Sequence, residues 1–270
     1  MMVTNYLNAL KLTPPQQPNL AFLQTLTQRH IERFTFNNLA VLLHENIQLD
    51  SESVFQKVVQ RDVGGYCFEH NKLAYDALAQ SGYNVRLVLA KVINNNERPV
   101  PRTHRLTIVE VEGQSFLVDV GFGAACPILP IALHASTPQN AGFEQYQIQS
   151  VNNNEYELVL LKEGGPFVLY RFDFAQYNEA DCEMGHFYSH KHPLAVFVNN
   201  LVVSKKTPTN TFAISNQHFI HSSTSGEKRS LITTSRDLFD LLSNVFGLSI
   251  EQEVCDFLFT QHIATRLETF

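Results

Sequence analysis

The spacing of apolar residues predicts a helical first part of the chain. In "PNLAFLQTLTQRHIERFTF" (residues 18–36), apolar side chains recur at three- and four-residue intervals behind the turn-forming cluster "TPPQQPN", which is typical of an amphipathic helix. A second helix is predicted for "SESVFQKVV", with Asp50 or Ser51 as its N-cap. A third begins at Cys67 and ends near Gly82, because glycine favours helix termination.

From Tyr83 onward the apolar residues alternate with polar ones, which indicates strands. Turn-forming clusters such as "NNNERPVP" separate these strands, so the segment is expected to form an antiparallel barrel or curved sheet. The predicted strands are "NVRLVLAKVI", "HRLTIVEVEGQSFLVDVGF" as a hairpin, "EQYQIQSV", "EYELVLL" and "FVLYRFDF", then "FVNNLVVSKK", "TFAISN" and "FIHSS". Helices are predicted again at "SRDLFDLLSNVFG" and "SIEQEVCDFLFTQHI".

Composition and charge narrow the function classes. The 270 residues are 44% hydrophobic and 17% charged, with a net charge of -6 and no basic stripe, so a nucleic-acid partner is not expected. The N-terminus lacks the pattern of a secretory signal, and no apolar run is long enough to cross a bilayer. These features predict a cytoplasmic protein that does not bind membranes.

Four cysteines, at positions 67, 126, 182 and 255, show no paired spacing. In a reducing compartment, scattered cysteines favour free thiols over a disulfide framework, and structural zinc sites usually bring their ligands in close pairs. Cys67 follows Gly64 and Gly65 at the predicted start of a helix, where the helix dipole favours the thiolate. A lone cysteine is nevertheless more often a small buried hydrophobic residue.

The hairpin "THRLTIVEVEGQSFLVDVGFG" offers a base and a carboxylate for Cys67. If Glu112 and Gly113 form a two-residue turn, His104 and Asp119 project from the same face of the sheet, within side-chain reach. A three-residue turn would reverse this parity. Asp119 lies in an apolar strand, where a buried carboxylate needs a partner; an exposed position at the strand end is the alternative.

A histidine-rich piece, "CEMGHFYSHKH", is the other candidate for chemistry. His186 and His190 would share one face of a helix, as in some zinc sites. Gly185 and Pro193 instead favour an irregular loop with hydrogen-bonded histidines. No metal site is expected.

These motifs together resemble the arylamine N-acetyltransferase family. The likeness rests on "GGYCFEHN" and the hairpin carrying His104 and Asp119, and it continues through "RFTFNNLAVLL", "SHKHPLAVFVNNLVVSKKTP" and "LLSNVFGLSI". The resemblance implies an α+β fold with an N-terminal helical bundle (residues 1–83), a central antiparallel β-barrel (84–190) and a C-terminal α/β lid (191–270). It also implies a Cys-His-Asp triad like that of papain-like and transglutaminase-like enzymes.

The family resemblance assigns roles to residues of this chain. Cys67 would be the nucleophile, His104 the base and Asp119 the residue that orients it. Acetyl-CoA would be a co-substrate, with no permanently bound cofactor, and an arylamine, hydroxyarylamine or hydrazine would accept the acetyl group in a ping-pong scheme. The resemblance further implies that Phe36 and Phe122 line the acceptor pocket and that Thr103 and Gly123 contact acetyl-CoA.

Two departures from the family pattern are visible. Family members usually have an arginine before the paired glycines and a glutamate near the second helix, where this chain has Val63 and Asn37. The hypothesis is that apolar packing replaces an ion pair here. Two other functions stay open: a cysteine hydrolase or amide synthase with the same triad, and a catalytically silent protein that binds CoA esters or aromatic ligands.

Overall fold

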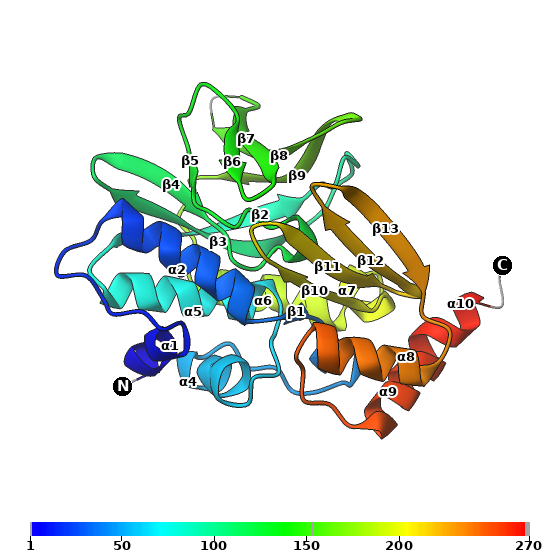
Figure 1. The fold of residues 1–270 in the computed structure, drawn as a ribbon. Helices are drawn as coiled ribbons and strands as arrows, with labels where there is room; N and C mark the ends of the chain where they lie inside the picture. The colour runs from blue at the N-terminus through cyan, green and yellow to red at the C-terminus, as the bar shows by residue number, and fades with distance from the viewer. Residues whose placement is uncertain (1, 153, 268–270) are drawn as a thin grey trace.

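The computed structural model describes residues 2–152 and 154–267. Positions 1, 153 and 268–270, which the predicted domain ranges include, lie outside the described part. The fold is α+β (Figure 1). Helices of the first part lie below a strongly curved antiparallel sheet, and a second sheet with the C-terminal helices lies beside them.

The helices of the first part confirm the sequence pattern. Asn19 caps α2 and Asp50 caps α4, each accepting a hydrogen bond from a backbone N–H three residues on. The third predicted helix begins at Cys67 and ends at Gln80. These elements are α1 (Met2–Ala9), α2 (Leu20–Arg33), α3 (Leu39–Leu42), α4 (Ser51–Phe55), η1 (Gln56–Gln60) and α5 (Cys67–Gln80). None of the helices in the described ranges has the length and apolar character needed to cross a membrane.

Eight antiparallel strands form the central sheet, in the order β5-β4-β3-β2-β9-β8-β7-β6. Strand β5 also contacts β7, so the sheet curls into a nearly closed barrel around its own apolar core. The strands are β2 (Asn84–Val92), β3 (Arg102–Val111), β4 (Gln114–Val118), β5 (Ile131–Ala132), β6 (Gln139–Ala141), β7 (Glu144–Ser150), β8 (Glu155–Lys162) and β9 (Gly165–Asp173); the short helix η2 (Gly123–Ala125) follows β4.

The β3–β4 hairpin has the predicted register. Val111 pairs with Gln114 and Thr107 with Val118. Glu112 and Gly113 both have positive φ angles, of 52° and 75°, as a two-residue type I′ turn requires. The parity that places His104 and Asp119 on one face is therefore confirmed.

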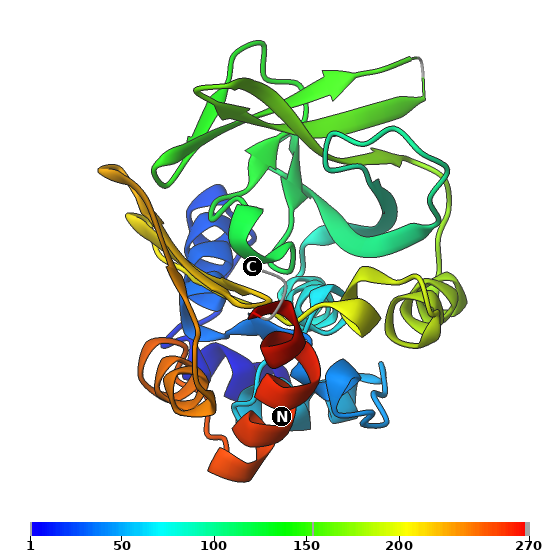
Figure 2. The same cartoon turned by 90° about the vertical axis from the view of Figure 1, so that its right-hand side faces the viewer.

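A second sheet has five strands in the order β1-β10-β11-β12-β13. Its edge strand β1 (Phe36–Asn37) comes from the first part of the chain and pairs with β10. Figure 2 shows this sheet beside the barrel, with the C-terminal helices at one end. The remaining elements are β10 (Val202–Lys206), β11 (Asn210–Ser215), β12 (His218–Ser223), β13 (Gly226–Leu231), α8 (Ser235–Asp240), η3 (Leu241–Val245), α9 (Gln252–Phe259), η4 (Thr260–Ala264) and α10 (Thr265–Leu267).

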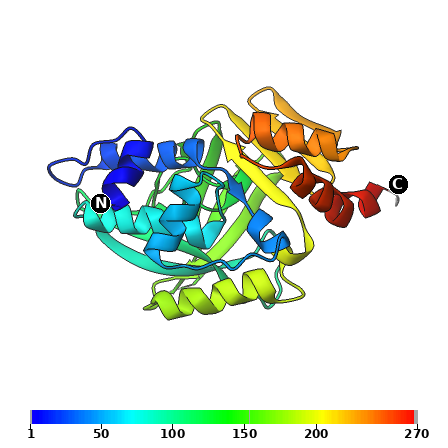
Figure 3. The same ribbon diagram turned by 90° about the horizontal axis from the view of Figure 1, so that it is seen from below.

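The histidine-rich piece is helical, so the predicted irregular loop is wrong. Helix α6 (Glu179–Lys191) packs against β3, on the opposite side of α5 from α1 and α2 (Figure 3). Gly185 suits this helix because a Cβ atom there would lie 2.7 Å from the Arg102 carbonyl oxygen and 2.9 Å from the Phe68 ring. The predicted strand at 197–206 is also shorter, because α7 (Val196–Asn199) occupies its start.

Candidate active site

Cys67 is the first residue of α5, and the turn before it needs both glycines. Gly64 has φ +66°, and a Cβ atom there would lie 2.1 Å from the Thr35 carbonyl oxygen. A Cβ atom on Gly65 would lie 2.7 Å from the Glu69 carboxylate. That carboxylate accepts the Tyr66 backbone N–H at 3.1 Å, which satisfies one free donor at the helix start.

The Cys67 thiol is buried and donates to the Thr103 carbonyl oxygen over 3.6 Å. Burial raises the pKa of the Cys67 thiol and the Asp119 carboxylate adds to the rise, while backbone N–H groups of Arg105 and Phe68 oppose it. The expectation that the helix start alone favours a thiolate is therefore wrong, because desolvation outweighs it. A thiolate at Cys67 requires a neighbouring base to take the proton.

His104 supplies an imidazole beside this thiol. It lies on β3, and its Nε2 is 2.7 Å from Oδ2 of Asp119, so the predicted contact is present and Asp119 is buried, not exposed. Burial acts to raise the pKa of Asp119, but His104, Asn71 and the Gly121 N–H stabilise the carboxylate and hold its pKa below the usual value. A carboxylate cannot donate, so Nε2 of His104 carries a hydrogen, and in the neutral ring Nδ1 is the nitrogen with the lone pair.

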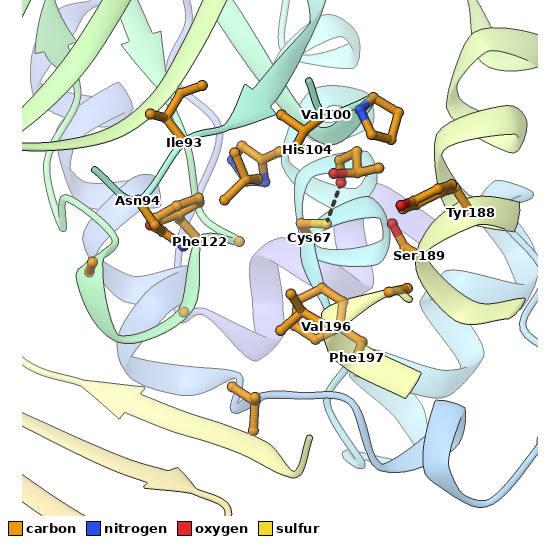
Figure 4. Close-up of a pocket in the computed structure, with 18 of the residues that line it drawn as sticks. Cys67, Ile93, Asn94, Val100, His104, Phe122, Tyr188, Ser189, Val196 and Phe197 are labelled. Atoms are coloured by element: carbon orange, nitrogen blue, oxygen red, sulfur yellow. Dashed lines mark hydrogen bonds between the residues drawn. The ribbon is translucent and has the colours of Figure 1, made fainter. Parts of the chain in front are cut away.

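A cavity of about 460 Å³ opens onto Cys67 and His104 (Figure 4). Six of the seven residues predicted for the site line it; the seventh, Asp119, lies behind His104. The Phe122 ring meets the His104 ring edge-on, with centroids 4.9 Å apart. The six lining residues are Phe36, Cys67, Thr103, His104, Phe122 and Gly123.

Asn71, which was not predicted from the sequence, ties α5 to Asp119. Its Nδ2 donates to Oδ1 of Asp119 at 3.0 Å and to the Arg105 carbonyl oxygen at 2.6 Å, and its Oδ1 accepts the Val120 N–H. The sequence does carry a signal for this role, because Asn71 is four residues after Cys67 and so shares its helix face.

Residues far along the chain complete the cavity wall. Segments from the β2–β3 connection and from α6 and α7 line it. The motifs "CEMGHFYSHKH" and "SHKHPLAVFVNNLVVSKKTP" contain the α6 and α7 residues, whereas no motif in the sequence pointed to the β2–β3 connection. The lining residues of these segments include Ile93, Asn94, Val100, Tyr188, Ser189, Val196 and Phe197 (Figure 4).

Gly121, which follows the end of β4, lies against the first turn of α5. A Cβ atom there would lie 2.9 Å from the Cα atom of Cys67 and 2.8 Å from Nδ2 of Asn71. We expect Gly121→Ala to displace Asp119 from His104 and to lower kcat/KM of the reaction at Cys67 by roughly 10²-fold, as small misplacements do. Steady-state kinetics measure this. Gly164→Ala, where an added Cβ atom would meet nothing within 4 Å, is the control, and equal losses in both variants would contradict the explanation.

The hypothesis that apolar packing replaces an ion pair at Asn37 and Val63 is wrong. The Asn37 amide donates to the Val63 carbonyl oxygen at 2.9 Å and to that of Thr35 at 3.3 Å, and its oxygen accepts the Leu39 N–H. Asn37 thus braces the loop through backbone hydrogen bonds, which need no charged residue at position 63.

The histidines of α6 make other contacts. The His186 and His190 rings stack with centroids 4.0 Å apart, and His186 Nε2 lies 3.1 Å from the Ile47 carbonyl oxygen. Within residues 2–152 and 154–267, no group of three histidine, cysteine or carboxylate side chains is placed to hold a metal ion.

Comparisons with known proteins agree with this architecture. A family model described as N-acetyltransferase matches residues 19–255. The arylamine N-acetyltransferase of Escherichia coli (strain K12) is 33% identical, over 86% of this chain and 84% of that protein. An arylamine N-acetyltransferase / N-hydroxyarylamine O-acetyltransferase of Salmonella typhimurium is 32% identical, over 91% of this chain and 88% of its own length.

Solved structures extend the likeness to the fold. The arylamine N-acetyltransferase of Salmonella typhimurium superposes with a TM-score of 0.89 at 28% identity, covering 96% of this chain and 98% of that one. The Mycobacterium marinum arylamine N-acetyltransferase in complex with CoA gives a TM-score of 0.90 at 26% identity, covering 97% and 99%. Because the family model and these relatives each match most of the chain, the protein belongs to the arylamine N-acetyltransferase family.

Proposed function

We propose that this chain transfers the acetyl group of acetyl-CoA to the nitrogen of arylamines, hydroxyarylamines or hydrazines, with Cys67 as nucleophile, His104 as base and Asp119 as its orienting residue. The observation that carries this is the position of Cys67 and His104 on one cavity, with the Asp119 carboxylate 2.7 Å behind the imidazole. The reaction runs in two half-reactions because Cys67 holds the acetyl group between substrates.

In the first half-reaction, Nδ1 of His104 takes the Cys67 proton as the sulfur attacks the thioester carbonyl of acetyl-CoA. The bond to the CoA sulfur breaks, and the imidazolium returns the proton to that leaving sulfur. His104 has to take this proton because burial raises the pKa of the Cys67 thiol. The Asp119 carboxylate stabilises the imidazolium while the acetyl-cysteine forms.

In the second half-reaction, the acceptor nitrogen attacks the acetyl-cysteine carbonyl. His104 takes the amine proton and passes it to the Cys67 sulfur, which leaves as a thiol.

We assign Phe36 and Phe122 to the aromatic walls that hold the acceptor, and Thr103 and Gly123 to contacts with acetyl-CoA. No permanently bound cofactor takes part in this scheme. All four cysteines are free thiols, which fits the proposed cytoplasmic site of action.

The proposal is tested by incubating the protein with acetyl-CoA alone, followed by intact mass and peptide mapping. We expect one acetyl group on the peptide that carries Cys67, none in Cys67→Ser, and an unchanged result in Cys255→Ser, which alters a buried thiol on α9. Addition of an arylamine or hydrazine should discharge the acetyl group.

Other outcomes separate the alternative functions. Discharge by water at the same rate, with or without amine, would identify a hydrolase. If neither acetyl-CoA nor longer acyl-CoA thioesters acylate Cys67, the transferase proposal fails, and the triad either serves another donor, as in a hydrolase, or is silent, as in a binding protein.

A further inference from the structure

Two fully buried histidines form a hydrogen-bonded relay behind the Cys67 turn. The Tyr6 hydroxyl lies 2.7 Å from Nδ1 of His30, and Nε2 of His30 lies 2.8 Å from Nδ1 of His70. Nε2 of His70 lies 3.1 Å from the Gly65 carbonyl oxygen. The relay joins α1, α2 and α5 and ends two residues before Cys67.

The chemistry of the last acceptor fixes every hydrogen in this relay. A carbonyl oxygen only accepts, so Nε2 of His70 carries a hydrogen and, in the neutral ring, Nδ1 must accept one. Nε2 of His30 therefore donates, and Nδ1 of His30 accepts from the Tyr6 hydroxyl. Both imidazoles have the Nε2–H tautomer as long as both are neutral.

The surroundings favour the neutral state of both rings. The pKa of His70 is lowered to about 4, mainly by burial. Hydrogen bonds to the backbone of Gly65 and Thr35 and the Asp119 carboxylate act to raise this pKa, whereas the Lys57 ammonium acts to lower it. Burial and the neighbouring His70 hold the pKa of His30 well below its usual range. The Lys57 ammonium is itself paired with the Glu69 carboxylate at 2.7 Å.

His70 touches both parts of the site that must be positioned. The Gly65 carbonyl oxygen that it binds also accepts the Asn37 N–H at 2.7 Å, which joins the nucleophile turn to β1. On its other side, the His70 ring stacks on Phe36, with centroids 6.1 Å apart, and Phe36 lines the cavity. One imidazole thus contacts the turn before Cys67 and the back of the acceptor wall.

We propose that His70, held by His30 and Tyr6, is a positioning residue for acetyl transfer that fixes the Gly65 turn and Phe36 through its neutral Nε2–H tautomer. This role rests on the proposed function of Cys67. It differs from that of a satisfied core histidine, because loss of the Gly65 hydrogen bond slows acylation of Cys67 in a protein that stays folded.

The kinetic test compares His70→Leu with His70→Gln. Leucine fills the space without hydrogen bonds, whereas glutamine can donate to Gly65 and accept from His30. We expect the single-turnover rate of Cys67 acetylation to fall about tenfold or more in His70→Leu. In His70→Gln the rate should stay within about threefold of wild type. These changes correspond to the usual free energy of one or two hydrogen bonds. Equal rates in folded His70→Leu and wild type would overturn the proposal.

A second pair of variants decides the matter if His70→Leu does not fold. Tyr6→Phe and Tyr83→Phe each remove one hydroxyl from the same apolar cluster, and only Tyr6 contacts the relay; Tyr83 donates to the Asn19 carbonyl oxygen. We expect acetylation to slow about threefold to tenfold in Tyr6→Phe alone. Equal effects of the two changes would contradict the relay.

A spectroscopic readout separates this proposal from the proposed function. In ¹⁵N-histidine-labelled wild-type protein we expect His30 and His70 to show the neutral Nε2–H tautomer between about pH 6 and 8. A Nδ1–H tautomer on either ring would overturn the relay. If wild-type protein takes no acetyl group at all, the proposed function fails. The rate at which iodoacetamide alkylates Cys67 then tests the relay, and His70→Leu and Tyr6→Phe should again be slower than His70→Gln and Tyr83→Phe.

Discussion

Asp119→Asn is expected to lower kcat/KM for acetyl transfer by roughly 10³- to 10⁴-fold, the scale of the corresponding change in a serine-protease triad. Oδ1 of Asp119 accepts from Asn71 and from the Gly121 N–H, while Oδ2 faces His104. These two donors hold the amide oxygen of an introduced asparagine at the Oδ1 position. Its NH₂ group then points at Nε2 of His104.

An asparagine NH₂ group that points at Nε2 reverses the tautomer of His104. Nε2 would accept from the asparagine, so Nδ1 would carry the hydrogen and could no longer take a proton from the buried Cys67 thiol. Steady-state kinetics with acetyl-CoA and an arylamine measure the loss. Asp76→Asn, a carboxylate on α5 bonded to Ser51 and Lys72, is the control and should be nearly neutral. Activity above a tenth of wild type in Asp119→Asn would contradict the assigned role.

Local pattern in the sequence was sufficient for the centre of the site. The Glu112-Gly113 turn fixes the hairpin register, and that register alone places His104 and Asp119 on one face of the sheet. Cys67 at the start of α5 followed from the paired glycines in the same way. Each of these inferences needs only short-range geometry.

The prediction for α6 was wrong because Gly185 and Pro193 were weighed above a capping signal. Asn178 accepts the Ala180 N–H and Asp181 accepts the Asn178 N–H, the pattern of a capping box that the letters "NEAD" already carry. Gly185 is small because α6 lies close to Arg102 and Phe68, not because the helix ends there. The close contact of α6 with Arg102 and Phe68 therefore explains the glycine at position 185.

Other features depend on long-range contacts that no local pattern encodes. The pairing of Phe36 and Asn37 with β10 joins segments more than 160 residues apart. The pKa of Cys67 depends on burial among several elements, so the helix dipole alone gave the wrong direction. Likewise, nothing in the spacing of Tyr6, His30 and His70 indicates that they meet.

The largest expected loss of stability comes from Lys57→Met. Lys57 on η1 and Glu69 on α5 form a buried ion pair at 2.7 Å, with side chains only 10% and 1% exposed. Removal of one partner leaves an uncompensated buried charge, so we expect the free energy of unfolding to fall by about 3–5 kcal/mol. Urea denaturation measures it. Arg33→Met, which breaks an ion pair with Asp62 that is about 40% exposed, should cost about 1 kcal/mol or less.

The second partner shows why the pair is present. Glu69 also accepts the Tyr66 N–H before Cys67, and glutamine could keep that bond without the charge. We therefore expect Lys57→Met with Glu69→Gln to recover most of the stability lost in Lys57→Met, since a buried ion pair contributes little net stability beyond neutral packing. If the double variant is as unstable as Lys57→Met alone, the uncompensated charge is not the cause. Recovery would mean that Lys57 holds the carboxylate mainly so that it can anchor the turn before Cys67.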